Sequence, residues 1–138
     1  MTVASAAVLL PRFLPDDWKG CFMLLVMIFV LSSFLDNIAA ALIGGAMAHT
    51  VFQKKVHIGY LAAIVACANA GGAGSVVGDT TTTMMWIQGV SPLAVVHAFV
   101  AAAVALVVCG IPASLQQNRY SPILKDAVPG VHIDWGRV

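Results

Sequence analysis

The stretch Ala68-Asn-Ala-Gly-Gly-Ala-Gly-Ser-Val-Val-Gly-Asp79 precedes four consecutive threonines and lies within a long apolar run, residues 58–90. As one continuous helix this run would be about 50 Å long, whereas the hydrocarbon core of a membrane is about 30 Å thick. A helix tolerates glycine poorly in its middle, and four glycines stand there: Gly71, Gly72, Gly74 and Gly78. The run therefore predicts a broken span, in which a helix of about 11 residues, an unwound centre at the glycines and a second short helix follow one another.

The composition identifies an integral membrane protein. Of the 138 residues, 60% are hydrophobic and 9% are charged, whereas an ordinary soluble domain carries about 25% charged residues. The net charge of +1 and the lack of a basic run argue against nucleic acid as a partner. Cys21, Cys67 and Cys109 stand singly in apolar segments, which predicts small packing residues rather than a metal site or disulfides.

A second interrupted run covers residues 20–52, where Asp36-Asn37 divides two apolar arms. The run is too long for one span of about 20 residues and too short for two spans and a turn. We therefore expect a re-entrant helical hairpin with a polar tip near the middle of the membrane. The alternative is one long tilted helix with a buried polar kink.

The other segments complete the predicted topology. Residues 1–17 form a short interfacial segment without the pattern of a cleavable signal peptide. Residues 93–115 are apolar and uncharged and read as a full span, and residues 116–138 read as a polar cytoplasmic tail. Residues 18–115 would thus be one transmembrane transport-domain repeat of an all-α membrane protein.

The basic residues test this topology. With a hairpin, a discontinuous transmembrane helix and one further transmembrane helix, all seven lie on one face: Arg12, Lys19, Lys54, Lys55, Arg119, Lys125 and Arg137. Basic loops are cytoplasmic in membrane proteins. We therefore expect a multi-pass protein of the cell inner membrane, with its basic loops and termini in the cytoplasm. One long helix through 20–52 would place Lys54 and Lys55 opposite Lys19, which disfavours that alternative.

Asp36 and Asp79 are the acidic residues within the apolar segments, and each stands at a predicted helix break with an asparagine nearby. An ionisable residue inside a membrane indicates function, since charge is costly there. Carboxylate, amide, hydroxyl and carbonyl oxygens at a helix break suit a hard cation such as sodium. A buried carboxylate can also hold a proton. The candidate cation- and proton-binding residues are Asp36, Asn37, Asn69, Ser75, Asp79 and Thr80, with sodium at Asp36, Asn37, Asn69 and Asp79.

Simpler roles are open for the same residues. Asp36 and Asp79 could cap the helices that follow them, and capping is compatible with ion binding. The threonines cannot all face one site, so Thr81 and Thr82 are weaker candidates than Thr80, and the others would bond back to carbonyls. The remaining polar residues have simpler interpretations still: Ser32 and Ser33 as helix-packing residues, His57 and His97 as interfacial residues, Trp86 as an interfacial anchor and His49 as a proton-path candidate.

Phe34-Leu-Asp-Asn-Ile38 and the stretch from Ala68 to Ile87 resemble the ion transporter superfamily, which includes D-type sodium/proton antiporters, arsenite permeases and citrate carriers. Gly-Asp-Thr-Thr-Thr at residues 78–82 is most similar to the antiporter branch. The resemblance carries over to Asp36 and Asn37 at the hairpin tip, and in the broken helix to Asn69, Gly71, Gly72, Gly74, Gly78, Asp79 and Thr80. Carboxylate carriers of the group show Ser-Asn-Thr and Gly-Thr-Pro-Pro-Asn at these two places. An aspartate at both favours cation exchange over a citrate or anion permease, which stays an alternative.

The resemblance implies a secondary transporter rather than an enzyme, with sodium and protons as transported species and no cofactor. It also implies two inverted repeats and a homodimeric scaffold in the lipid bilayer. Because only one repeat is found, we expect a fragment of an inverted-repeat transporter that lacks the second repeat, or else a non-transporting membrane remnant. An intramembrane aspartyl protease fits poorly, because Val76 replaces the first glycine of Gly-x-Gly-Asp and Leu35 replaces the tyrosine before the partner aspartate.

Overall fold

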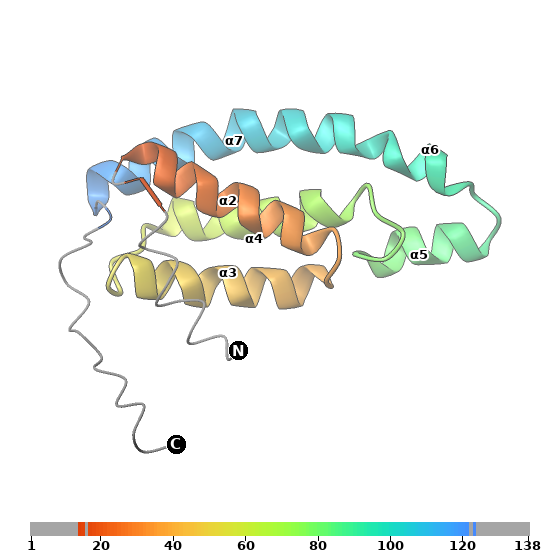
Figure 1. Cartoon of the computed structure of the whole chain (residues 1–138), viewed down its shortest axis with the longest axis horizontal. Coiled ribbons are helices and arrows are strands. Elements are labelled where there is room, and N and C mark those ends of the chain that lie inside the picture. The colour runs from red at the N-terminus through yellow and green to blue at the C-terminus, as the bar shows by residue number, and fades with distance from the viewer. Residues whose placement is uncertain (1–13, 16, 122, 124–138) are drawn as a thin grey trace, which may run out of the picture.

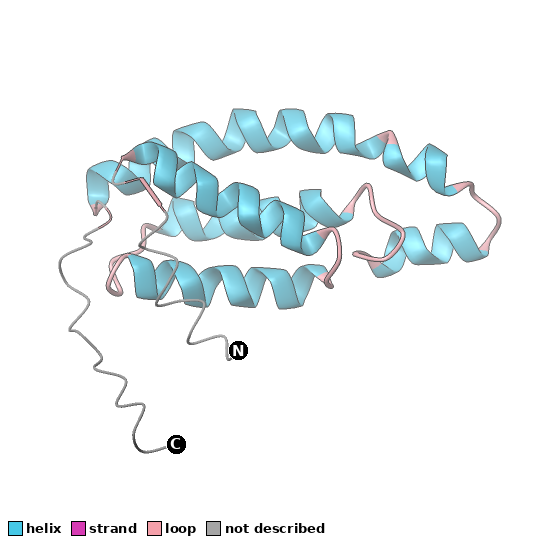
Figure 2. Cartoon of the chain, in the orientation of Figure 1, coloured by secondary structure: helices cyan, strands magenta, loops and turns pink. Residues whose placement is uncertain are grey.

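Six helices and no strand make up the part of the chain that the structure, a computed structural model, describes: residues 14, 15, 17–121 and 123. The helices are α2 (Trp18–Ser32), α3 (Asn37–Val51), α4 (Ile58–Gly72), α5 (Thr80–Ile87), α6 (Pro92–Val96) and α7 (Ala98–Tyr120) (Figures 1 and 2). The predicted all-α class is confirmed for these residues. Most of the predicted segments 1–17 and 116–138 lies outside them.

Residues 18–51 form a helical hairpin of two antiparallel helices (Figure 1), and its predicted re-entry into a membrane stays a prediction. α2 and α3 are each 15 residues long and a non-helical turn, residues 33–36, joins them. The backbone leaves the helix between Ser32 and Asn37, so one continuous helix through 20–52 is excluded. Buried residues recur every three or four positions along α2, which keeps one face against the core: Gly20, Cys21, Leu24, Leu25, Ile28 and Ser32.

The predicted break in the next run is also present. α4 ends at Gly72, residues 73–79 are not helical, and α5 begins at Thr80. The first half is longer than the expected 11 residues, because helix continues through Gly71 and Gly72, which the sequence had placed in unwound backbone. A Cβ at Gly71 would strike the carbonyl of Phe29 in α2. Glycine is therefore required at this position for close helix packing.

α6 and α7 together form the long apolar element of the fold. Residues Pro92–Tyr120 comprise 29 residues, and an 18-residue window within them has a mean hydropathy of 2.6, so the element is long and apolar enough to cross a membrane. The helix continues past the predicted end at Leu115, so residues 116–120 are helical and do not belong to a polar tail. The reason is that Gln117, expected in water, is fully buried and bonded to the connection between α3 and α4.

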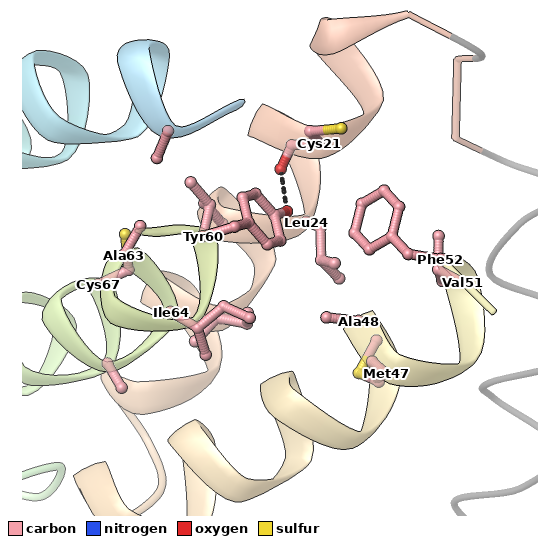
Figure 3. Packing of buried hydrophobic residues seen from close by; sticks show 14 of the residues in the cluster. Cys21, Leu24, Met47, Ala48, Val51, Phe52, Tyr60, Ala63, Ile64 and Cys67 are labelled. Carbon is pink, nitrogen blue, oxygen red and sulfur yellow. Dashed lines mark hydrogen bonds between the residues drawn. The ribbon is translucent and has the colours of Figure 1, made fainter. Parts of the chain in front are cut away.

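The core lies where α4 packs against α2, α3 and α7 (Figure 3). Tyr60 of α4 is fully buried; its hydroxyl donates to the carbonyl of Cys21 at 2.6 Å, and its ring meets Phe52 edge-on. Cys21 and Cys67 are buried in this core, as expected of packing residues, whereas Cys109 is exposed.

The described basic residues gather at one end of the bundle. The start of α2, the connection between α3 and α4, and the end of α7 lie together there (Figure 1). These segments carry Lys19, Lys54, Lys55 and Arg119. These four therefore lie at one end of the bundle, the predicted common membrane face stays a prediction, and Arg12, Lys125 and Arg137 lie outside the described residues. The hairpin turn lies away from this end.

Replacing Tyr60 with phenylalanine should lower the free energy of unfolding by about 1 kcal/mol, because a buried hydroxyl bond is lost while the ring is kept. The matched control is Tyr120→Phe, since Tyr120 is 60% exposed. Thermal denaturation of both variants in detergent micelles measures the difference. Equal stability of the two variants would show that the Tyr60–Cys21 bond does not contribute.

Candidate functional site

The turn of the hairpin contacts the break in the α4–α5 element. The Ser32 hydroxyl donates to the carbonyl of Ala68, and the Ser33 hydroxyl lies 3.0 Å from the carbonyl of Gly71. Gly71 is in the last turn of α4, where carbonyls have no donor within the helix. The two predicted helix interruptions therefore meet at one place, and side chains of one satisfy the backbone of the other.

Asn37, the first residue of α3, lies at the centre of this contact. The two ends of an amide are assigned from their hydrogen-bonding partners. With its nitrogen toward the break, Asn37 donates to the Gly78 carbonyl at 3.1 Å, the Ala68 carbonyl at 3.3 Å and the Ser32 hydroxyl at 3.0 Å. The opposite orientation would place an oxygen against two carbonyls. The first orientation is therefore the favoured one.

The other end of the Asn37 amide faces Asn69 of α4. It lies 3.4 Å from Oδ1 of Asn69. The Nδ2 of Asn69 donates to the Val65 carbonyl at 3.1 Å, which keeps its Oδ1 turned toward Asn37. In the favoured orientation of Asn37, two amide oxygens thus face each other. The structure thus brings these two candidate residues together, and their role in cation binding stays a prediction.

Glycines make this contact possible. A Cβ at Gly72 would strike the side chain of Asn37, and one at Gly78 would strike the carbonyl of Ser32. Gly74 packs in the same way beneath the ring of Phe99 in α7. Within the described chain, positive φ among glycines occurs at Gly89 and at none of the four candidates. Their role here is close approach rather than a left-handed turn.

The two aspartates cap the helices that follow them. Asp36 accepts a hydrogen bond from the N–H of Ile38, and Asp79 accepts one from the N–H of Thr81, each at 3.2 Å. The capping interpretation is therefore confirmed for both, and it leaves one oxygen of each carboxylate for another partner. Neither aspartate is hydrogen-bonded to Asn37 or Asn69, and the described residues contain no group of three or more His, Cys, Asp or Glu that could hold a metal.

Hydroxyl groups within and after the break form hydrogen bonds that fix the conformation of the loop. Ser75 accepts from the N–H groups of Val77 and Gly78 at 3.2 Å. Thr82 and Thr83 bond back to carbonyls of the loop. Hydrogen bonds from some of the threonine hydroxyls to backbone carbonyls were expected, and Thr82 and Thr83 form them. Thr80 is exposed, so its candidate role rests on position alone.

Ser32 and Ser33 are the residues that the sequence undervalued. Their interpretation as packing residues missed the bonds to the end of α4. The available signal was their position at the end of an apolar arm, directly before the polar tip. Of the histidines, His49 and His97 are exposed, whereas His57 caps α4 at the basic end of the bundle.

Two plant proteins are similar to part of this chain. This chain is 37% identical over 83 residues to the sodium/proton antiporter 2 of Arabidopsis thaliana, and the matched region covers 58% of this chain and 20% of that protein. Over 62 residues it is 39% identical to the sodium/proton antiporter 1 of the same plant, covering 44% of this chain and 11% of that protein. The chain thus matches a fifth or less of the length of these relatives, which are named as transporters rather than enzymes. No family model matches the chain, and no solved structure matches it significantly.

Replacing Gly78 with alanine should destabilise the protein by about 1–3 kcal/mol, because the new methyl group would push the loop away from the backbone of Ser32. Gly45→Ala is the matched control: a Cβ at Gly45 in α3 meets nothing within 4 Å. Alanine there should leave stability unchanged or raise it by up to about 1 kcal/mol. Chemical denaturation in micelles measures both, and equal effects would contradict the close contact of tip and break.

Proposed function

We propose that this chain is the ion-binding part of a secondary active transporter that exchanges sodium for protons. The observation that carries the proposal is the meeting of the hairpin tip with the helix break, where the amides of Asn37 and Asn69 lie 3.4 Å apart. The similarity to two proteins named sodium/proton antiporters supports the same class of function. The proposal that this chain transports sodium and protons rests on these two arguments together.

We propose the following arrangement in the membrane. Helices of 15 residues are about 22 Å long and fall short of the hydrocarbon core, whereas Pro92–Tyr120 is about 43 Å long. α2 and α3 extend over only part of the length of α6 and α7 (Figure 1). The hairpin then enters and leaves on the basic, cytoplasmic side, and its turn at 33–36 lies within the membrane. Such a site is half of an inverted-repeat transporter, completed by a second repeat and a homodimeric scaffold.

The proposed cation lies between the two facing amide oxygens. Two ligand oxygens at right angles around a cation, each about 2.4 Å away, are about 3.4 Å apart. Two amide oxygens that face each other repel, because neither carries a hydrogen atom to donate, and a cation between them would remove this repulsion. The free carboxylate oxygens of Asp36 and Asp79 are the further ligands of this proposal, and Asp79 is the group at which a proton competes with sodium. Loop carbonyls and Thr80 complete the set of available oxygens.

An anionic substrate such as citrate is the less favoured alternative. Helix N-termini are the usual places where proteins bind anions, because free N–H groups point outward there. The N-termini of α3 and α5 are already capped by their own carboxylates, Asp36 and Asp79. An incoming carboxylate would meet negative charge at both places. The arrangement therefore favours a cation.

Sodium should stabilise the 138-residue chain in micelles, and choline at equal ionic strength should not. At a concentration tenfold above the dissociation constant, the expected gain is about 1.4 kcal/mol. Asn69→Ala should abolish this gain, and the exposed amide variant Gln88→Ala should keep it. Stabilisation by citrate instead of sodium would favour the anion permease, and stabilisation by neither would favour a non-transporting remnant.

Asp79→Asn should lower the sodium affinity of the chain, because it removes the negative charge of one proposed ligand while its amide oxygen keeps the cap of α5. Titration of Trp fluorescence with sodium measures the affinity of both chains, and an unchanged affinity in the variant would exclude Asp79 as a ligand.

A further inference from the structure

His57 occupies a helix N-cap, a position that short oxygen-bearing side chains usually fill. It directly precedes α4, and its Nδ1 accepts a hydrogen bond from the N–H of Gly59 at 3.0 Å. A ring nitrogen accepts only through its lone pair. The imidazole in this geometry is therefore neutral, with its proton on Nε2. Protonation of the ring replaces the acceptor with a donor and removes the cap bond.

The backbone of the same residue is tied to the end of α7. The N–H of His57 donates to Oε1 of Gln117 at 2.7 Å, and Nε2 of Gln117 reaches the carbonyls of Lys55 at 3.0 Å and Ser121 at 3.3 Å. Gln117 is fully buried, so water does not replace these bonds. The His57 ring packs edge-on against Tyr120, 5.4 Å away. One junction thus joins the α3–α4 connection, the start of α4 and the end of α7.

The connection before His57 is strained. Gln53 and Lys54 have φ angles of 49° and 69°, in the left-handed region that residues with a side chain rarely adopt. Such a conformation persists only where the surrounding structure holds it. The bonds from Gln117 to Lys55 and His57 hold the end of this connection. Loss of the hydrogen bonds at His57 would therefore allow Gln53 and Lys54 to leave their left-handed backbone conformation.

Charged and titratable groups of several elements lie around His57. Among the described residues these groups are His49 at the end of α3, Lys54 and Lys55 in its own connection, Tyr60 at the start of α4, Arg119 and Tyr120 at the end of α7, and Asp17 and Lys19 at the start of α2. The free N–H groups at the start of α4 add the positive end of a helix dipole.

We propose that His57 is a pH-sensitive cap that holds the junction of α4 and α7 when neutral and releases it when protonated. Histidine side chains generally change charge between about pH 5 and pH 8. The neutral form is the one bound in the folded state, so the contribution of the cap to stability is present at the upper end of this range and is lost as the pH falls. This inference is independent of any transport activity.

The test compares melting temperatures of the full chain in detergent micelles at pH 7.5 and pH 5.5. His57→Asn keeps a capping oxygen that does not titrate in this range. On acidification, the melting temperature of the unmodified chain should fall about 3 °C further than that of His57→Asn. His57→Ala should be the less stable chain at pH 7.5 and should lose this extra fall. An equal fall in the unmodified chain and in His57→Asn would overturn the proposal.

A second measurement on the unmodified chain does not depend on how the variants fold. The amide proton of Gly59 and the Nδ1 nitrogen of His57 should shift together in an NMR titration, with one shared midpoint. In His49→Asn, which removes an exposed histidine of α3, this titration should be unchanged. A Gly59 amide that stays constant while His57 titrates would also overturn the proposal.

Discussion

The fold depends on how backbone polar groups are satisfied where two apolar helical runs are interrupted. A buried carbonyl or N–H group that has no partner within its helix needs one from elsewhere in the protein. The hairpin tip supplies these partners for the end of α4 through Ser32 and Ser33, and Asn37 joins them to the loop at Gly78. The two helix interruptions thus stabilise each other.

This mutual dependence explains the distribution of glycine and charge. Gly71 and Gly78 stand against the backbone of α2 and its end, and Gly72 stands against the side chain of Asn37, so the contact of tip and break needs residues without a Cβ. The described basic side chains lie at the opposite end of the helices, where Gln117 joins α7 to the α3–α4 connection. One end of the bundle therefore carries the described basic side chains, and the contact between hairpin tip and helix break lies away from that end.

Local features predicted much of this arrangement, and packing decided the rest. The hairpin and the break follow from segment length, from glycines within an apolar run and from the polar pair Asp36-Asn37, all of which are readable in one stretch of chain. From the sequence, Asn37 and Asn69 could only be assigned to the same site. Their direct contact could not be predicted, because residues 32 positions apart meet through helix packing. The burial of Gln117 could not be predicted, because its partners lie about 60 residues away in sequence.

The most direct test of the central claim is a cross-linking measurement in lipid bilayers. Asn37→Cys and Asn69→Cys are introduced together after Cys21, Cys67 and Cys109 are replaced, and a short bifunctional reagent joins thiols within its reach. The account predicts an efficient cross-link for this pair and none when Gly45→Cys, two turns along α3, replaces Asn37→Cys. Failure of the first pair to cross-link, or equal reaction of both pairs, would contradict the meeting of hairpin tip and helix break.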